Sequence, residues 1–288
     1  MEYDVIIIGS GPAGISASLY TARANLKTLI ISKGIGILQK VTKIDNYYGL
    51  ETTLTGEELQ EIGINQAKKL GVEFEEDEVL KIDYENSFIV ETINSKYKAK
   101  SVIIATGTSR KTPKINGIKE YEGKGVSYCA TCDAFFFRGK DVAVLGAKEY
   151  ALHEAEELKR VANSVTILTN GEEVVQNRSN EFCVEEKRIK ELRGGEIIEE
   201  IHFEDNTIKK IDGVFVAIGT ASSSDLARKI GARIDEKGNI LVNENMSTNV
   251  PNLYACGDCT GGILQIAKAV YEGMVAGMSV IKSVKKLI

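Results

Sequence analysis

Apolar runs along the chain alternate with stretches in which apolar residues recur every three or four positions. The first run, Val5–Ile8, leads into a helical pattern that carries Ala17 and Tyr20, and a second apolar run follows at Thr28–Ile31. Short continuous apolar runs are typical of strands buried in a parallel sheet, and a three-to-four-residue period is typical of helices. The pattern therefore predicts that the chain opens with a strand–helix–strand unit.

Residues 33–104 show a less regular pattern than the opening unit. Residues 33–56 are expected to form loop and turn. Residues 57–70 are expected to form a helix whose inward side chains are Leu59, Ile62, Ile64 and Leu70. Three short strands are then expected to form a small antiparallel piece laid on the parallel sheet, at 72–82, 87–93 and 97–104.

A second strand–helix–strand pattern begins in the middle of the chain. It consists of a strand at Asp141–Gly146, a helix over about 150–162 and a strand at Ser164–Leu168, and the strand Gly213–Ile218 closes the unit. Strand-like segments follow near 240–242 and 253–255. A final helix, beginning near Gly261-Gly262, carries the chain to its end.

Two breaks in the pattern suggest how the domains are organised. Glycines and a proline between 111 and 125, and the run Ala221–Ser224, lie about 110 residues apart, which indicates one domain inserted into another. We expect a discontinuous domain at 1–112 with 222–288, and an inserted domain at 113–221. The predicted fold class is α/β: two Rossmann-like, three-layer nucleotide-binding domains with small antiparallel sheet additions.

Composition narrows the function classes. With 43% apolar residues and a net charge of −5, the chain has the composition of a globular protein that does not use nucleic acid or an anionic membrane as its main partner. It begins without a signal-peptide pattern and has no apolar run long enough to span a bilayer. Together with five cysteines, this predicts a cytoplasmic protein whose disulfides are catalytic rather than structural.

The turn after the first strand reads Gly9-Ser10-Gly11-Pro12-Ala13-Gly14. Glycines at this spacing allow a tight turn, close approach of the backbone to a pyrophosphate, and packing of the helix on the strand. One position departs from the usual pattern. Ser32 stands at the end of the second strand, where an acidic residue usually holds the adenosine ribose, and we expect Ser32 to take that place.

Cys129-Ala-Thr-Cys132 places two thiols three positions apart, a spacing that can close a disulfide ring and act as a two-electron switch. The same spacing serves zinc and iron–sulfur sites, and Cys256-x-x-Cys259 would complete a four-thiolate set. We expect no metal, because small buried cysteines often only fill space. Cys183 is expected to be incidental, His153 to lie on a helix surface, and His202 to lie in a strand.

The whole chain resembles the low-molecular-weight thioredoxin reductases, which are FAD proteins of two nucleotide-fold domains. The resemblance implies that 1–112 with 222–288 is the FAD-binding domain and that 113–221 is the inserted redox domain. The resemblance rests on Gly9–Gly14, Asn46 with Gly49, Ala105-Thr106-Gly107, Cys129-x-x-Cys132-Asp133 with Phe135-Phe136, and Gly257-Asp258. It implies that Cys132 faces the flavin, Cys129 attacks the substrate disulfide and Asp133 manages protons. With the turn and Ser32, it implies an FAD site formed by Gly9, Ser10, Gly11, Pro12, Ala13, Gly14, Ser32, Asn46, Ala105, Thr106, Gly107, Gly257, Asp258 and Gln265.

The second unit departs from that family. Its turn reads Gly146-Ala147-Lys148 instead of three glycines, and Glu172 and Glu173 stand where a basic cluster usually grips the 2′-phosphate of NADPH. Leu264 replaces an arginine near Gln265. Three interpretations compete: NADPH still binds with Lys148 turned outward, NADH binds with Glu172 on its ribose, or the unit has lost its nucleotide.

The last interpretation resembles the ferredoxin-dependent flavin thioredoxin reductases, which work without pyridine nucleotide. The leading hypothesis is therefore an FAD disulfide oxidoreductase that passes electrons from ferredoxin to thioredoxin, with no NADPH expected. The alternatives are an NADPH-dependent thioredoxin reductase and a non-catalytic flavin/dithiol redox sensor. The family also implies a homodimer. Candidate ferredoxin-docking residues are Lys96, Lys98 and Lys100, then Lys187, Arg188 and Lys190, then Lys282, Lys285 and Lys286, although a solvated surface explains each group as well.

Overall fold

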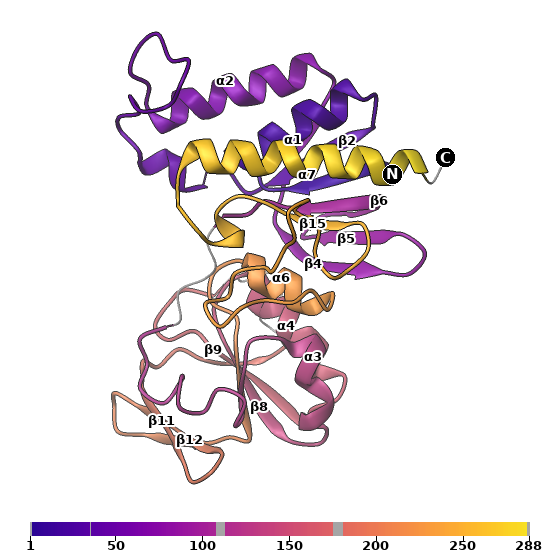
Figure 1. Cartoon of the computed structure of the whole chain (residues 1–288). Coiled ribbons are helices and arrows are strands. Elements are labelled where there is room, and N and C mark those ends of the chain that lie inside the picture. The colour runs from indigo at the N-terminus through magenta and orange to yellow at the C-terminus, as the bar shows by residue number, and fades with distance from the viewer. Residues whose placement is uncertain (1, 35, 108–112, 175–180, 287–288) are drawn as a thin grey trace. The chain divides into compact units, whose positions relative to one another are not determined.

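The computed structural model describes residues 2–34, 36–107, 113–174 and 181–286 (Figure 1). The chain divides into two compact units, the first formed by 1–110 with 222–288 and the second by 111–221. The boundary that we expected after residue 112 falls outside the described residues.

The first unit is built on a seven-stranded sheet in the order β3-β2-β1-β6-β5-β4, with β15 beside β6. Strand β6 has two partners along one edge: Lys98 and Ala99 pair with antiparallel β5, whereas Val102–Ile104 pair with parallel β15. The antiparallel strands therefore continue the main sheet rather than lying on it, which corrects our expectation. The strands are β1 (Glu2–Ile8), β2 (Thr28–Ser32), β3 (Glu73–Glu76), β4 (Val79–Tyr84), β5 (Phe88–Thr92), β6 (Lys96–Ile104) and β15 (Leu253–Ala255).

Helices α1 and α7 pack against each other beside this sheet (Figure 1). Their backbones lie so close that a Cβ on Gly273 would stand 2.1 Å from the carbonyl oxygen of Ala13, and the Ser16 hydroxyl donates to the Val270 carbonyl at 2.7 Å. The helical segments of the unit are α1 (Pro12–Arg23), η1 (Gly36–Lys40), α2 (Gly56–Lys69), α6 (Ser223–Lys229), η3 (Asp258–Thr260) and α7 (Ile266–Lys286).

The inward face of α2 differs from our prediction. Ile62 and Leu70 are exposed, whereas Gln60 and Ala67 are buried and Gly63 approaches Ile15 of α1. Residues 60, 63 and 67 share one side of a helix with 3.6 residues per turn, and Ile62 points elsewhere. The apolar residues were only a partial guide: Ile64 packs against the core as predicted, whereas small and polar side chains occupy much of the contact.

The second unit contains a five-stranded parallel sheet, a small antiparallel sheet and, among its described residues, the helical segments α3 (Ala130–Asp133), η2 (Ala134–Phe137) and α4 (Glu149–Lys159). The parallel sheet has the order β10-β9-β8-β14-β7, formed by Cys183–Glu185, Ser164–Leu168, Asp141–Leu145, Gly213–Val216 and Val126–Ser127. The antiparallel sheet consists of β11 (Ile189–Gly194), β12 (Ile198–Phe203) and β13 (Ile208–Lys210). We did not predict this sheet, because charged residues interrupt its apolar alternation.

Several predicted boundaries moved for local reasons. Ser222, expected in a linker, is instead the N-cap of α6 and forms a capping box with Asp225. Segment 240–242 forms no strand, and Ile240 makes an isolated bridge to Ile234. Helix α7 starts at Ile266, because Gly261 and Gly262 each have a φ of 77°, which a right-handed helix does not allow.

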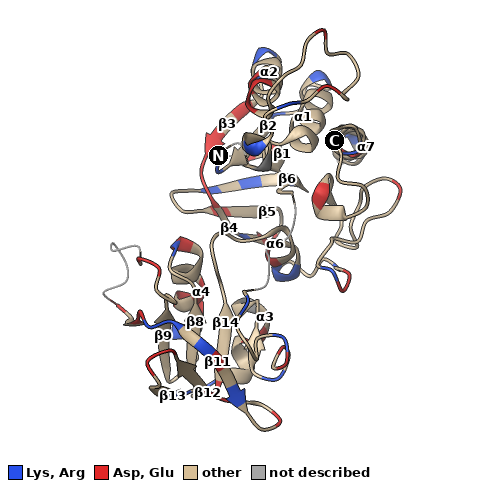
Figure 2. Ribbon diagram, turned by 90° about the vertical axis from the view of Figure 1, so that its left-hand side faces the viewer, with Lys and Arg blue, Asp and Glu red and all other residues tan. Residues whose placement is uncertain are grey.

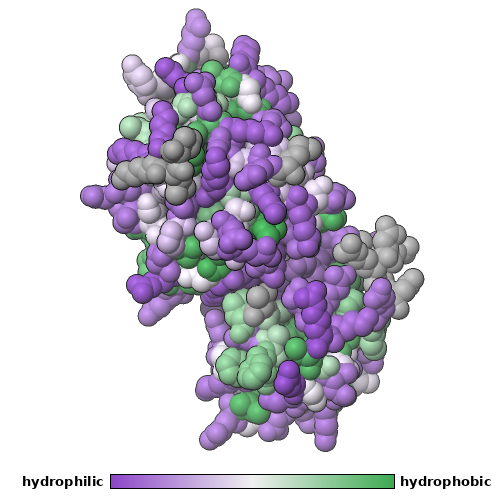
Figure 3. Space-filling view, turned by 90° about the vertical axis from the view of Figure 1, so that its right-hand side faces the viewer, coloured by the Kyte–Doolittle hydropathy of each residue, from purple (hydrophilic) through white to green (hydrophobic). Residues whose placement is uncertain are grey.

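The predicted α/β class, with parallel sheets and a small antiparallel addition, is confirmed. Polar side chains dominate the face of the molecule drawn in Figure 3, with apolar side chains in scattered patches. Within the described ranges, the helices are too short or too polar to cross a bilayer.

Candidate functional site

The glycine turn of the first unit lies where β1 passes into α1. Gly9 has a φ of 108°, and a Cβ there would stand 2.4 Å from the Ala105 carbonyl oxygen, while a Cβ on Gly14 would stand 2.0 Å from the Gly9 oxygen. Around the Cβ position of Gly11, in contrast, there is open space to 4 Å. Close packing beneath the turn and space above Gly11 fit a pyrophosphate at the N-terminus of α1.

A side chain from another helix supports this turn. Gln60 on α2 is buried, and its side-chain amide donates a hydrogen bond to the backbone oxygen of Ser10. The Ser10 hydroxyl in turn donates to the Gly34 oxygen at 3.4 Å. We missed Gln60 from the sequence, because a glutamine on a helix gives no sign of which distant backbone group it will contact.

The end of β2 carries more charge than its own residues suggest. Ser32 is half-buried, and the next residue, Lys33, forms an ion pair with Glu78, whose side chain is buried. The fold thus brings a carboxylate to the end of the strand where the usual acidic residue is missing. Because Glu78 lies after β3, only the parallel pairing of β2 with β3 brings the two together.

The Gly257-Asp258 turn is fastened to α7. Glu272 accepts a hydrogen bond from the Gly257 N–H at 2.8 Å, and the Lys268 ammonium donates to the oxygens of Gly257 and Gly261 at 2.8 and 2.6 Å. Burial raises the pKa of the Asp258 carboxyl above its usual range, although nearby Lys268 acts in the opposite direction. Lys268 and Glu272 were not predicted as site residues.

The structure brings some of the expected FAD residues together. Gly257 lies against Ala13, where its Cβ would stand 2.8 Å from the Ala13 Cβ, and Ala105 lies under Gly9. Thr106 is exposed and Gly107 has a φ of 80°. Asn46 and Gln265 are exposed, and no hydrogen bond within the described ranges joins either side chain to the glycine turn.

In the second unit, Cys129 and Cys132 form a disulfide with a Cα–Cα distance of 5.3 Å. Cys129 is the N-cap of α3 (Ala130–Asp133), and its sulfur accepts the Cys132 N–H at 3.2 Å. Cys129 is 3% exposed, whereas Cys132 is exposed. The exposed Phe135 and Phe136 follow in a short 3-10 helix, η2 (Ala134–Phe137).

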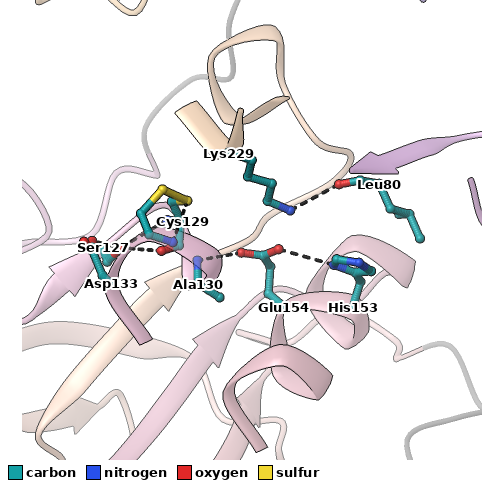
Figure 4. The surroundings of a disulfide bond; sticks show 9 residues. Leu80, Ser127, Cys129, Ala130, Asp133, His153, Glu154 and Lys229 are labelled. Carbon is teal, nitrogen blue, oxygen red and sulfur yellow. Dashed lines mark hydrogen bonds and ion pairs between the residues drawn. A yellow bond between two sulfur atoms is a disulfide. The ribbon is translucent and has the colours of Figure 1, made fainter. Parts of the chain in front are cut away.

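Two carboxylates lie at this turn (Figure 4): one is linked to it through a serine and the other accepts a hydrogen bond from its backbone. Ser127 donates to Asp133 Oδ2 at 2.6 Å and accepts the Cys129 N–H at 3.1 Å, so it links Asp133 to the first cysteine. On α4, Glu154 accepts the Ala130 N–H at 2.9 Å. Neither Ser127 nor Glu154 was predicted.

His153 differs from the sequence interpretation, whereas His202 has the predicted place. His153 is buried on α4 rather than lying on its surface, with Nδ1 3.4 Å from Glu154 Oε1. His202 lies in β12 as expected, but its Nε2 is 2.8 Å from Glu200 Oε2. Each therefore has a carboxylate partner that we did not foresee.

The glycine turn of the second unit keeps its tight geometry but not its open surface. A Cβ on Gly146 would meet the Ala217 oxygen at 2.2 Å, while Lys148 is exposed and is the N-cap of α4. The following loop carries the exposed Glu172 and Glu173. The structure also brings Arg188 beside this loop, with its Nε 3.2 Å from the Cβ position of Gly171, a positive charge that the sequence order concealed.

The candidate basic docking segments are partly neutralised. Lys96 and Lys100 lie on β6 (Figure 2) and pair with Glu91 and Asp4 at 3.1 and 2.8 Å, and Lys187 pairs with Asp205 at 3.1 Å. The exposed members among the others are Lys98, Arg188, Lys190, Lys282 and Lys285. The Lys286 side chain lies outside the described part of the structure.

The second C-x-x-C is chemically different from the first. Cys256 and Cys259 are fully buried free thiols, and burial raises the pKa of Cys259 to about 12 and that of Cys256 well above its usual value. The described residues contain no cluster of three or more His, Cys, Asp or Glu side chains arranged to hold a metal ion. Burial makes these thiols poor candidates for exchange chemistry.

Comparison with known proteins gives a consistent result over the whole chain. A family model described as pyridine nucleotide-disulphide oxidoreductase matches residues 3–273. The thioredoxin reductase of Bacillus subtilis (strain 168) is 36% identical over 305 residues, which cover 99% of this chain and 96% of that protein. The structure of the atypical thioredoxin reductase TRi from Desulfovibrio vulgaris Hildenborough is 38% identical, with a TM-score of 0.94 and 98% of each chain covered. A ferredoxin-flavin thioredoxin reductase from Clostridium acetobutylicum is 31% identical, with a TM-score of 0.73 and 99% of each chain covered.

Proposed function

Because the chain belongs to the pyridine nucleotide-disulphide oxidoreductase family, we propose that it is a flavin-dependent thioredoxin reductase that works through the Cys129–Cys132 disulfide. The observation that carries this proposal is the disulfide itself, which is followed by Asp133 and the exposed Phe135 and Phe136. Relatives named thioredoxin reductase align over nearly the whole chain. The two cysteines and Asp133 are assigned as catalytic residues.

The FAD site is assigned to the first unit. Gly9–Gly14 and the N-terminus of α1 would hold the pyrophosphate, and the residues around Ser32 would hold the adenosine end. Asp258 would bind the flavin chain, with Asn46, Ala105–Gly107 and Gln265 nearby. Bound FAD would supply a group that accepts electrons singly and gives them as a pair to a disulfide.

The proposed exchange with thioredoxin takes place in two steps. After reduction, the Cys129 sulfur attacks one sulfur of the thioredoxin disulfide, forming a mixed disulfide and releasing a thiolate that takes a proton. The Cys132 sulfur then attacks Cys129, which restores the internal disulfide and releases the second thioredoxin thiol. Ser127 holds one oxygen of Asp133, which orients the carboxyl group beside the turn for proton transfer.

Accessibility makes the identity of the attacking sulfur testable. Cys129 is buried in the disulfide form, so its attack on a protein requires the turn to open. A Cys132→Ser variant should therefore accumulate a mixed disulfide between Cys129 and thioredoxin, seen as a higher-mass band in non-reducing gels. If the trapped complex forms only in Cys129→Ser, through Cys132, the two roles are reversed.

The proposed electron donor is reduced ferredoxin, and the NADPH-binding role of the second unit is proposed to be lost. In support, Ala147 and Lys148 follow Gly146 in its turn, and Glu172 and Glu173 would repel a 2′-phosphate. The likeness to a ferredoxin-flavin thioredoxin reductase points the same way. We also propose that the protein forms a homodimer.

An NADPH-dependent thioredoxin reductase remains a second candidate, because Arg188 lies beside the loop at Gly171 and offers a positive charge there. Anaerobic mixing with NADPH separates the two. Rapid and stoichiometric bleaching of the flavin would overturn the ferredoxin proposal, whereas the proposal expects thioredoxin reduction only with photoreduced ferredoxin. A redox sensor would give at most one turnover per flavin in the same assay.

A further inference from the structure

Glu154 is a buried carboxylate for which the proposed reaction gives no role. It lies on α4 on the same side of the helix as the buried Tyr150, Ala151 and Leu158, and the residue is 1% exposed. Moving a carboxylate out of water costs several kcal/mol unless it is well hydrogen-bonded. An acidic residue at this place therefore calls for an explanation beyond packing.

Its contacts lead directly to the redox disulfide. Oε2 accepts the backbone N–H of Ala130 at 2.9 Å, and Oε1 lies 3.4 Å from Nδ1 of His153 (Figure 4). Ala130 is the residue immediately after Cys129, inside the ring that the disulfide closes. The carboxylate thus binds the ring itself.

Two other N–H groups around the first cysteine are engaged in different ways. The Cys129 N–H donates to Ser127 Oγ, and the Cys132 N–H donates to the Cys129 sulfur. The contact from the Cys132 N–H favours negative charge on the Cys129 sulfur, as a backbone N–H that points at a thiolate does. Glu154 acts in the opposite direction, because it occupies the Ala130 N–H and brings a negative charge to the same turn.

We propose that Glu154 is a positioning residue for disulfide exchange: it fixes the Cys129–Cys132 turn through Ala130 and opposes negative charge on the two sulfurs. Reduction of the disulfide adds two electrons, and the two protons that neutralise them then stay on the sulfurs as a dithiol. The pair would give up a proton only as a sulfur attacks its substrate. This inference rests on the proposed function, because it assigns the residue a part in that exchange.

A neutral side chain could cap Ala130 equally well, so charge and capping must be separated. Glu154→Gln keeps an oxygen acceptor of similar reach but removes the charge. Glu157→Gln is the matched control, because it removes a carboxylate from the same helix, where Glu157 pairs with the exposed Arg160. Among the contacts described within this unit, Asp133 reaches the turn through Ser127 and His153 lies beside Glu154, and a His153→Gln variant measures the contribution of the histidine.

The experiment measures how fast the two sulfurs are alkylated, and it depends neither on the flavin nor on thioredoxin turnover. The full chain is reduced with dithiothreitol and alkylated with iodoacetamide over a range of pH, and the Cys129–Cys132 peptide is quantified by mass spectrometry. We expect Glu154→Gln to raise the alkylation rate at neutral pH roughly tenfold, which corresponds to a fall of one unit in the thiol pKa. Glu157→Gln should match the wild type.

Two results would overturn the inference. One is a Glu154→Gln profile identical to that of the wild type, which would leave Glu154 as a structural cap only. The other needs no variant: a wild-type thiol pKa well below the ordinary value of about 8.5 would show that the turn favours thiolate. Failure of the thioredoxin assay would leave this measurement intact, so the inference and the proposed function fail separately.

Discussion

At the scale of single residues, the five cysteines fall into chemically distinct groups. Cys132 and Cys183 are exposed, Cys129 is nearly buried in its disulfide, and Cys256 and Cys259 have no exposed surface. Because the thiolate is the reactive form, exposure and pKa together decide which sulfur reacts. The two C-x-x-C segments look alike in sequence, but the first forms a disulfide with one exposed cysteine, whereas the second holds two buried free thiols.

This difference predicts a labelling pattern for the free cysteines. Burial raises the pKa of Cys259 to about 12 and also that of Cys256, so both remain protonated and inaccessible at pH values near 8. We expect iodoacetamide to modify Cys183 in the native protein, and Cys256 and Cys259 only after denaturation, as measured by peptide mass spectrometry. Native labelling of Cys256 would show that this site opens readily.

We expect the Asp258 carboxylate to lower the stability of the flavin-free protein while it helps to bind the flavin. Burial raises its pKa above the ordinary 3.8, so the folded protein binds this proton more tightly than the unfolded chain does. The free energy of unfolding therefore decreases as pH rises through the two pKa values, and the ionised carboxylate destabilises the flavin-free protein at neutral pH.

We therefore expect Asp258→Asn to raise the melting temperature of the flavin-free protein at pH 7 while weakening its retention of FAD. The gain should be under about 1 kcal/mol, because solvent screens a half-buried carboxyl. It should shrink as the pH is lowered toward the ordinary carboxyl pKa. Melting curves of both proteins over this pH range test the sign, and a lower melting temperature at every pH would contradict it.

At the scale of elements, local patterns predicted the strands and helices that bury apolar faces. The strand Ser164–Leu168 was located from its sequence to the residue, and Thr28–Ile31 to within one. What escaped prediction depends on partners distant in sequence. The pairing of β2 with β3 delivers Glu78 to Lys33, and the packing of α4 beside α3 delivers Glu154 to Ala130.

The contact between α1 and α7 gives a prediction at this scale. A Cβ on Gly273 would lie 2.1 Å from the backbone oxygen of Ala13, so Gly273→Ala must push the two helices apart. We expect a loss of about 1–3 kcal/mol in the free energy of unfolding, the usual cost of overpacking, measured by urea denaturation.

Gly63→Ala on α2 is a matched control for that change. Its Cβ would meet only the side chain of Ile15, at 3.2 Å, which can yield by a small rotation. The better helix propensity of alanine should offset this contact, leaving stability within about 0.5 kcal/mol of wild type. Equal losses in both variants would show that backbone contact between α1 and α7 is not the cause.

At the scale of the whole molecule, each unit has its own hydrophobic core. The first core draws on both ends of the chain, for example Ile7 and Ile103 with Val280, because β15 and α7 return to complete the sheet and cover α1. The core of the second unit is formed within one continuous segment, including Ile118 and Val214. Two breaks in the pattern suggested an inserted domain, whereas the partners of β6 could be identified only from the structure.

The continuity of the second core leads to a prediction about folding. All strands of the two sheets in this unit lie between residues 126 and 216, so a fragment of residues 113–221 contains every partner that these strands need. At about 110 residues it is large enough to form an independent core.

We expect the fragment to unfold cooperatively in urea and to form the Cys129–Cys132 disulfide in air. Because Glu154 and Ser127 lie within it, the reduced fragment should also show the alkylation profile of the full chain. A fragment that stays unfolded would mean that the first unit supplies contacts on which the dithiol turn depends.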